Sequence, residues 1–213
     1  MRESRRVLLS LAALVAGLVV VNVIATMFYR STGGFGYLDL NGGANLFDSR
    51  PAYTPAGAHA LLAGYGADGR TRYAVLIFAF DIAFPAVLAL FGALAIRHSA
   101  RLAGVPAAAR RWLIVLPLAY LAGDYTENAL ELALLHGFPH ESARLATLAS
   151  TVTGVKTALA TGMLAVIVVA YVVALVLALI RGRRRSDAST IRGHVDARAG
   201  RPGDGEPGAN PVP

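Results

Sequence analysis

The chain has 213 residues, of which 55% are hydrophobic and only 15% are charged, and its formal net charge is +7. This composition excludes a soluble globular domain, and its basic residues need no nucleic-acid partner to explain them because they flank apolar segments. The absence of cysteine excludes disulfides, iron–sulfur clusters and thiol catalysis.

Four apolar runs are long enough to cross a bilayer as helices, which takes roughly 20 residues each. They cover about residues 7–29, 73–96, 112–135 and 149–180. The first run is too long for the apolar region of a secretory signal, and no small-residue cleavage site follows it. We therefore predict an all-α, polytopic membrane protein, a four-helix bundle in one domain over residues 1–185.

The distribution of arginine predicts the orientation, because cytoplasmic segments close to spans are enriched in Lys and Arg. Three arginines precede the first run, four lie in the 97–111 connection, and four more lie in RGRRR after the last run. We expect both termini to be cytoplasmic and the protein to lie in the plasma (inner) membrane. Residues 186–213 are rich in Gly, Pro and charge and predict a disordered cytoplasmic tail.

The long connection at residues 30–72 then lies outside. Its first part is full of Gly, Asn and Asp and predicts an irregular loop. Thr54 is a good N-cap and Pro55 suits a first helical residue, so we predict a short helix over about 55–64. The Asp68-Gly69 pair predicts a turn into the second span. The loop would either simply cover helix ends or form a lid over a site that opens outward.

Polar side chains within the spans should face the bundle interior, because exposing them to lipid is costly. The predicted spans carry one basic, four acidic and two amide side chains of this kind: Lys156, Asp81, Asp124, Glu127, Glu131, Asn22 and Asn128. Asn22, Asp81 and Glu127 each lie 16 residues from a cytoplasmic flanking arginine, which is about 24 Å along a helix. We therefore predict a polar layer at one height in the outer half of the membrane.

Two local patterns strengthen this layer. Residues 124, 127, 128 and 131 have the spacing i, i+3, i+4, i+7, which stacks them on one helix face. Pro85 has no N–H to return to the carbonyl of Asp81, so we expect a kink there. Asp81 would then offer both a carboxylate and a free carbonyl, as cation or proton sites often do.

Lys156 is the only lysine, and its depth in the fourth span is ambiguous. A high position makes Glu131 its partner, whereas a lower one makes the partner Glu127 or Asp81. Four carboxyls cannot all be ionised beside one ammonium in a low dielectric, so we expect some of them to carry protons at pH 7. Such a group suits proton relay, acid–base chemistry, or binding of a cation or an amine.

The stretch YTPAGAHALLAGYGADGRTRYAVLIFAFDIAFP, the motif DYTEN and the single lysine in the fourth span resemble an uncharacterised family of small bacterial four-helix membrane proteins. The resemblance covers roughly residues 37–160, and the family has no established activity to carry over. It implies that one pattern contains Tyr53, Gly69, Arg70, Asp81, Asp124, Glu127, Asn128 and Lys156.

We expect an outward-facing polar site that binds or transforms a small amphiphile such as a lipid or isoprenoid. The residues expected to carry proton or cation chemistry, with their counter-charge, are Asp81, Asp124, Glu127 and Lys156. The residues expected to contribute to binding are Asn22, Arg70, Asn128 and Glu131. The sequence leaves open whether the protein is an enzyme.

Two alternatives remain, namely a proton- or ion-coupled transporter or transporter subunit, and a scaffold with a purely structural polar network. Membrane lipids are the expected partners, with a homo-oligomer possible and no nucleic acid. His136 and His140 flank a short turn, but two histidines without a third ligand do not predict zinc. No motif predicts a metal or another cofactor.

Overall fold

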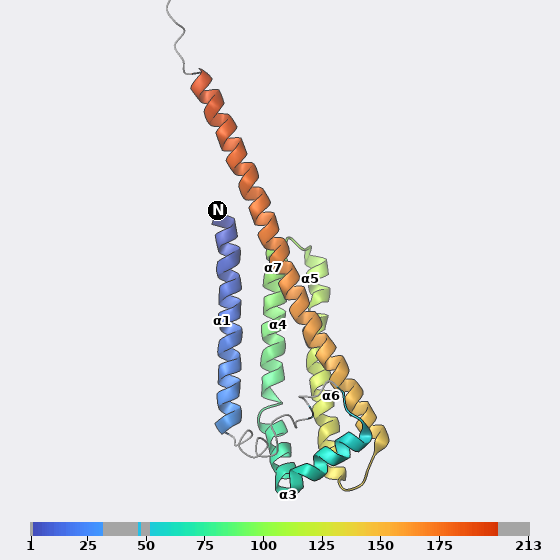
Figure 1. The fold of residues 1–213 in the computed structure, drawn as a ribbon. Helices are drawn as coiled ribbons and strands as arrows, with labels where there is room; N and C mark the ends of the chain where they lie inside the picture. Colours follow the sequence, from blue (N-terminus) through green and yellow to red (C-terminus); the bar gives the residue numbers. More distant parts are fainter. Residues whose placement is uncertain (1, 32–46, 48–51, 200–213) are drawn as a thin grey trace, which may run out of the picture.

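The computed structural model describes residues 2–31, 47 and 52–199, and within these ranges the regular secondary structure is all helical (Figure 1). The long elements are α1 (Arg2–Ser31), α3 (Pro55–Ala79), α4 (Ala83–Leu102), α5 (Ala107–Leu113), α6 (Val115–Gly137) and α7 (Ala143–Ala199). This confirms the all-α fold class. The predicted irregular loop falls on residues 32–46 and 48–51, which lie outside the described residues.

Three helical stretches in the described part of the chain are long and apolar enough to cross a membrane: Glu3–Ile24, Pro55–Leu102 and Ala143–Arg184. Large apolar side chains are exposed along all three, among them Ile24, Leu90 and Val169. Surfaces of this kind suit a lipid environment rather than water. Helix α6 is not among the three, because three acidic side chains interrupt its apolar sequence.

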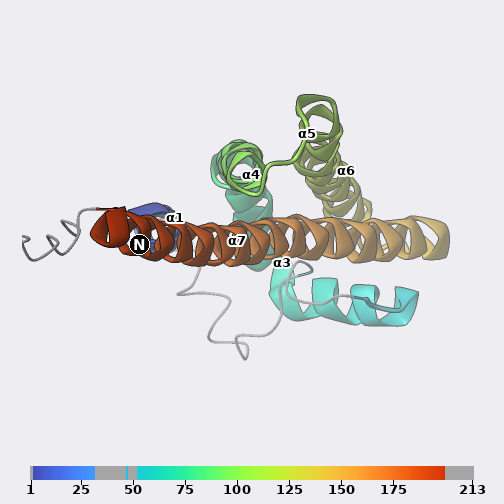
Figure 2. The ribbon, with the colours of Figure 1, turned by 90° about the horizontal axis from the view of Figure 1, so that it is seen from above.

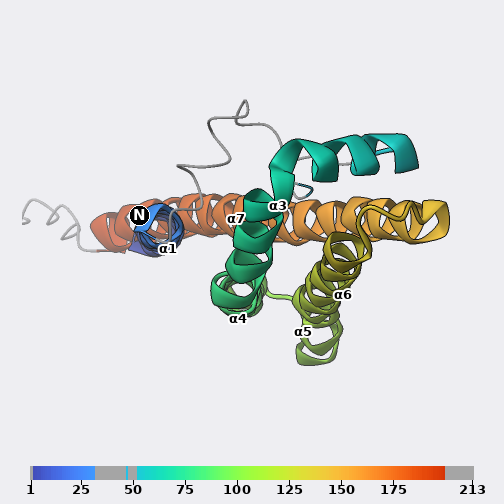
Figure 3. The same cartoon turned by 90° about the horizontal axis from the view of Figure 1, so that it is seen from below.

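Helices α1, α4 and α6 pack against the long α7, which runs diagonally past them (Figure 1). The start of α1, the α4–α5 connection and the C-terminal part of α7 lie toward one end, and α3 with the α6–α7 connection lies toward the other (Figure 1). Seen from above and below, the first half of α3 lies on one side of α7, and α4 and α6 lie on the other (Figures 2 and 3). One apolar core, which contains Tyr65, lies toward the α3 end. A second core, which contains Met163, includes the start of α1 and lies toward the opposite end.

Helix α3 begins as its sequence predicts but continues further. The Thr54 hydroxyl accepts a hydrogen bond from the Gly57 N–H at 3.1 Å, and Pro55 is the first helical residue. The helix changes direction at Gly66, whose φ of 65° is readily accessible to glycine. Because this single residue makes the bend, the predicted Asp68-Gly69 turn is wrong, and the chain is helical from there to Ala79.

The predicted kink near Asp81 is confirmed as a break between α3 and α4 at residues 80–82. Pro85 is buried in the first turn of α4, where its missing N–H cannot extend the helix backwards to the carbonyl of Asp81. The predicted third span is also divided, since α5 ends at Leu113 and α6 starts at Val115, two residues before the buried Pro117.

The predicted disordered tail is corrected in part, because α7 continues to Ala199. Residues 186–199 contain no proline and a single glycine, so the backbone can extend the preceding helix. The first proline after α7 is Pro202. Residues 200–213 lie outside the described residues.

Candidate functional site

The only lysine of the chain lies between two carboxylates of the neighbouring helix. Lys156 on α7 forms ion pairs with Asp124 Oδ1 at 3.3 Å and with Glu127 Oε2, both on α6. The Glu127 side chain is fully buried, and only 11% of the Lys156 side chain is exposed. Of the partners considered for Lys156, Glu127 is therefore the one that it contacts in the structure. Charges so little exposed are costly unless they are paired, so this contact constrains how α6 and α7 pack.

Helices α6 and α7 approach each other closely at this contact, because Gly123 has no side chain there. A Cβ placed on Gly123 of α6 would lie 3.6 Å from the Cβ of Lys156, which is ordinary van der Waals contact. The two backbones therefore meet directly beside the ion pairs. Thr153, one turn before Lys156, is fully buried, and its hydroxyl donates to the carbonyl of Ala149 at 3.0 Å. The same face of α7 thus carries polar groups that are satisfied within the protein.

The α3–α4 break is bound by side chains from α6. The Asn128 amide donates to the backbone carbonyl of Asp81 at 3.0 Å, and the Tyr125 hydroxyl donates to the carbonyl of Ile82 at 2.8 Å. Asn128 also donates to Asp124 Oδ2 at 3.3 Å. We predicted that the carbonyl of Asp81 is free, but it accepts a hydrogen bond from Asn128. This amide lies on the same face of α6 as the acidic side chains. The arrangement links the break to the Lys156 ion pairs.

Glu131 lies one turn further along α6 and has a different partner. Its Oε2 accepts a hydrogen bond from the Tyr73 hydroxyl of α3 at 2.7 Å. Both residues are about 1% exposed. The Tyr73 ring packs against Tyr65 and Phe47, with centroid separations of 5.5 and 6.2 Å. Glu131 is therefore placed against an aromatic cluster rather than beside the lysine.

The structure gathers most, but not all, of the predicted site residues. Asp124, Glu127, Asn128 and Lys156 are linked by ion pairs and a hydrogen bond. Asp81 joins them through its backbone carbonyl, and Glu131 lies one turn further along α6. The chain therefore forms one polar region, here called the charge cluster, from these six residues.

Two predicted binding residues lie elsewhere. Asn22 is exposed on α1 and donates to the carbonyl of Leu18 on its own helix at 2.8 Å. Its predicted height along the helix ignored rotation about the helix axis, which turns it away from the interior. Arg70 donates to the carbonyl of Leu62 at 3.0 Å, and its guanidinium lies 4.1 Å from the ring centroid of Phe138. It therefore braces the bend of α3 against the α6–α7 connection.

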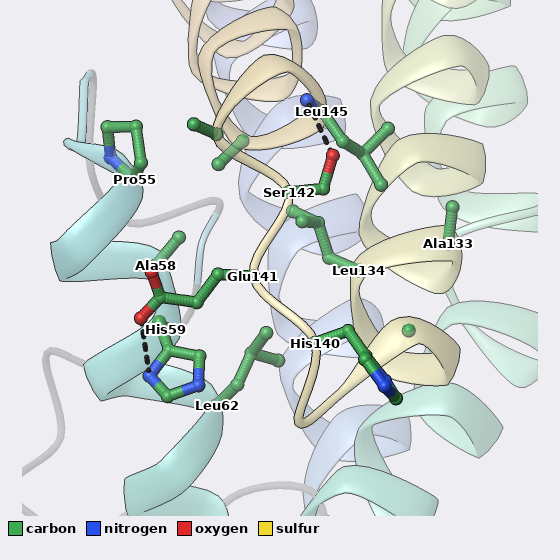
Figure 4. A pocket seen from close by; sticks show the side chains of 13 residues that line it. Pro55, Ala58, His59, Leu62, Ala133, Leu134, His140, Glu141, Ser142 and Leu145 are labelled. Carbon is green, nitrogen blue, oxygen red and sulfur yellow. Dashed lines mark hydrogen bonds and ion pairs between the residues drawn. The ribbon is translucent and has the colours of Figure 1, made fainter.

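The histidines do not form a metal site within the described residues. His136 contacts the carbonyl of Leu132 on its own helix through Nδ1 at 2.7 Å. His140 borders a surface pocket between α3 and the α6–α7 connection, and its ring is directed away from the His59–Glu141 pair at the pocket (Figure 4).

Three residues of the region escaped the sequence reasoning. Tyr73, Tyr125 and Gly123 set the hydrogen bonds and the close approach described above. Gly123 and Tyr125 flank Asp124 in the motif GDYTEN, so their position next to a buried acid was the available signal. Tyr73 carried no comparable signal, because it stands at the start of an apolar run beside Arg72.

Comparison of the chain with protein-family models, with curated proteins and with solved structures finds no match. The charge cluster is therefore the feature of this chain that indicates a function.

Proposed function

We propose that the protein is a four-span integral membrane protein, in which α6 is an additional spanning segment, the third in chain order, and the four spans form a bundle. The acidic face of α6 is buried against α3, α4 and α7, which removes the cost of placing it in the membrane. The basic N-terminus, the α4–α5 connection and the arginines after the last apolar run lie toward one end (Figure 1). This supports a plasma-membrane protein with both termini in the cytoplasm. The resemblance to small bacterial four-helix membrane proteins fits this arrangement.

Within this fold, we propose that the charge cluster binds, and in an enzymatic role transforms, a small amphiphile such as a lipid or isoprenoid. The observation that carries the proposal is the pairing of one buried ammonium, Lys156, with two buried carboxylates, Asp124 and Glu127, beside a broken helix. A membrane protein that needed only to hold two helices together would require fewer ionisable groups, since each one adds a desolvation cost.

The charge balance favours a ligand whose polar end is neutral or cationic. The cluster holds four carboxyls, and its only basic side chain already contacts two of them. Arg70 is engaged by Leu62 and Phe138 instead. A phosphate or carboxylate would therefore meet repulsion, whereas a hydroxyl or an amine would find hydrogen-bond acceptors.

The α3–α4 break provides the approach to the cluster. Asp81 is only half-buried, and its neighbours Ile82 and Tyr125 are exposed on a surface that would face lipid. An amphiphile could thus reach the acids sideways from the membrane and keep its apolar part in lipid. Backbone that leaves the helix at membrane depth is tolerated where protein groups satisfy it, as Asn128 and Tyr125 do here.

Native mass spectrometry of the detergent-extracted protein tests this proposal. Wild type should retain an amphiphile of defined mass, and Glu127→Gln and Lys156→Met should lose it. Thr126→Ala is a matched control, because Thr126 is exposed on α6 and bonds only its own helix at the Ala122 carbonyl. Retention that is equal in all four proteins, or absent in wild type, would contradict an amphiphile site at the cluster.

A second candidate, a proton- or ion-coupled transporter or transporter subunit, is favoured by the broken helix itself. Discontinuous helices near buried acids are a recurrent feature of secondary transporters. Four spans enclose little space, so this function would involve a homo-oligomer. Proteoliposomes under a pH gradient should then show proton flux that Asp81→Asn abolishes, whereas an amphiphile-binding protein should show none.

A further inference from the structure

The first part of α3, Pro55–Tyr65, forms a helical cap over the ends of α6 and α7. Its side chains Ala58, Leu62 and Tyr65 are buried in one apolar core with Leu134 of α6 and Ala146 of α7. At its C-terminal end the cap is followed by Gly66, the residue with φ 65° where α3 bends, and a Cβ there would meet no atom within 4 Å. The cap is thus a separate helical piece with a pivot at one end.

His59 attaches the cap to the α6–α7 connection through both of its ring nitrogens. Nε2 lies 3.2 Å from the carbonyl oxygen of Pro139. Nδ1 lies 3.3 Å from Glu141 Oε1, and Figure 4 shows this second contact. The ring also stacks on Phe138 with centroids 5.2 Å apart. Both partner atoms are acceptors, whereas a neutral imidazole has only one N–H. Only the protonated ring can donate to both oxygens at once.

The charged and titratable groups around His59 are few. Glu141 is 66% exposed and His59 is 32% exposed, so the pair is reachable by solvent. From the cap's own helix, the Arg70 guanidinium lies over the Phe138 ring. From the connection, His140 borders the same pocket, but its ring is directed away from the pair (Figure 4). Glu141 is thus the carboxylate that contacts His59.

We propose that His59, Pro139 and Glu141 form a pH-sensitive latch that holds the cap closed. The latch is closed when His59 is protonated. As the pH rises and the ring loses its proton, one nitrogen presents a lone pair to an oxygen, the contact is lost, and the cap pivots at Gly66. Histidine is the side chain most often used as a pH switch in proteins.

The cap is connected to the charge cluster through aromatic contacts. Tyr65 of the cap packs on Tyr73, and Tyr73 donates its hydrogen bond to Glu131. Opening the cap would remove the cover from the Glu131 side of the cluster. Control of ligand access by the latch rests on the proposed function. Opening of the cap does not rest on it, and the labelling experiment measures only this opening.

The chain has no native cysteine, so single cysteines report the opening without background. Ala58 belongs to the cap and is buried on its inner face, whereas Ala60 is exposed on the same helix. In detergent-extracted protein, the maleimide labelling rate of Ala58→Cys is divided by that of Ala60→Cys, which cancels the general effect of pH on thiol reactivity. We expect this ratio to rise at least about threefold between pH 5.5 and pH 8, because histidine loses its charge in this interval.

Three variants separate the latch from other causes. Glu141→Gln supplies an amide that can donate to a neutral ring, so the ratio should stay low at both pH values. His59→Phe keeps the stacking on Phe138 without the polar contacts, so the ratio should be high at both. His140→Gln should leave the wild-type response intact. The latch is wrong if the ratio does not change with pH in wild type, or if Glu141→Gln or His59→Phe retains the full response.

Discussion

Asn128 on α6 donates its side-chain amide to the backbone carbonyl of Asp81, 47 positions earlier in the chain, at 3.0 Å. Through this bond α6 supplies the donor that Pro85 cannot. The same α6 face carries the two acids that bind Lys156. The break between α3 and α4, the position of α6 and the ion pairs of α7 are therefore parts of one connected arrangement.

Replacing Asn128 with leucine should destabilise the protein by about 1–3 kcal/mol, because the carbonyl of Asp81 loses its donor in a partly buried position. Thermal unfolding in detergent, followed by circular dichroism, measures the change. Tyr125→Phe is the matched control, since it removes a bond to the next carbonyl, at Ile82, from a more exposed side chain, and it should cost less.

Repeating Asn128→Leu in a protein that also carries Pro85→Ala tests why the loss of Asn128 is destabilising. An alanine at this position restores an N–H that can reach the carbonyl of Asp81 within a continuous helix. The cost of Asn128→Leu should then shrink. An equal cost in both backgrounds would show that Asn128 does not compensate for the proline.

Lys156→Met should destabilise the protein by about 3–5 kcal/mol, because it leaves Asp124 and Glu127 buried without their cation. Adding Glu127→Gln should recover much of the loss, since the amide carries no charge. The two single variants and the double variant are compared by thermal unfolding in detergent. Strictly additive losses would argue against the ion pair as the source of the effect.

Lys156→Arg should also lower the unfolding temperature and reduce amphiphile retention. The two carboxylates hold a compact ammonium, and a planar guanidinium needs a different set of oxygens. Unfolding temperature and retained mass are measured on the same preparation. Wild-type behaviour in both measurements would remove any special role for lysine at this position.

Tyr73→Phe should cost about 1–3 kcal/mol, because Glu131 loses the hydroxyl that donates to its Oε2 while the aromatic packing of the ring is kept. Glu131→Gln keeps an oxygen that can accept this bond and should cost less. A double-mutant cycle with Glu131→Leu isolates the interaction, and a coupling energy near zero would show that the bond does not contribute to stability.

Single cysteines test the proposed orientation in whole cells. Ala67 follows the bend of α3, and Ala107 begins α5; both are exposed and lie at opposite ends of the helices. A membrane-impermeant maleimide should label Ala67→Cys and leave Ala107→Cys unlabelled until the cells are opened. Labelling of Ala107→Cys in intact cells would reverse the orientation.

Much of the helical framework was predictable because its causes are local. The apolar runs require helices in a membrane, Thr54 and Pro55 define the start of α3, and Pro85 explains the break after Asp81. The i, i+3, i+4, i+7 spacing on α6 was enough to put Asp124, Glu127, Asn128 and Glu131 on one face. Local rules failed where two nearby glycines were both able to form the bend. The sequence favoured Asp68-Gly69, but the chain bends at Gly66.

Only the tertiary structure decided which of these residues meet. Counting along a helix estimates depth, but it does not give rotation about the axis or the tilt of a neighbour. Asn22 therefore shares a predicted height with the acids and yet is exposed, while Lys156 pairs with Asp124 and Glu127 rather than with Glu131. The contact of Asn128 with Asp81 and the attachment of His59 to the α6–α7 connection join segments far apart in sequence. Such contacts depend on how whole helices pack, because each helix can satisfy its own backbone without specifying its neighbours.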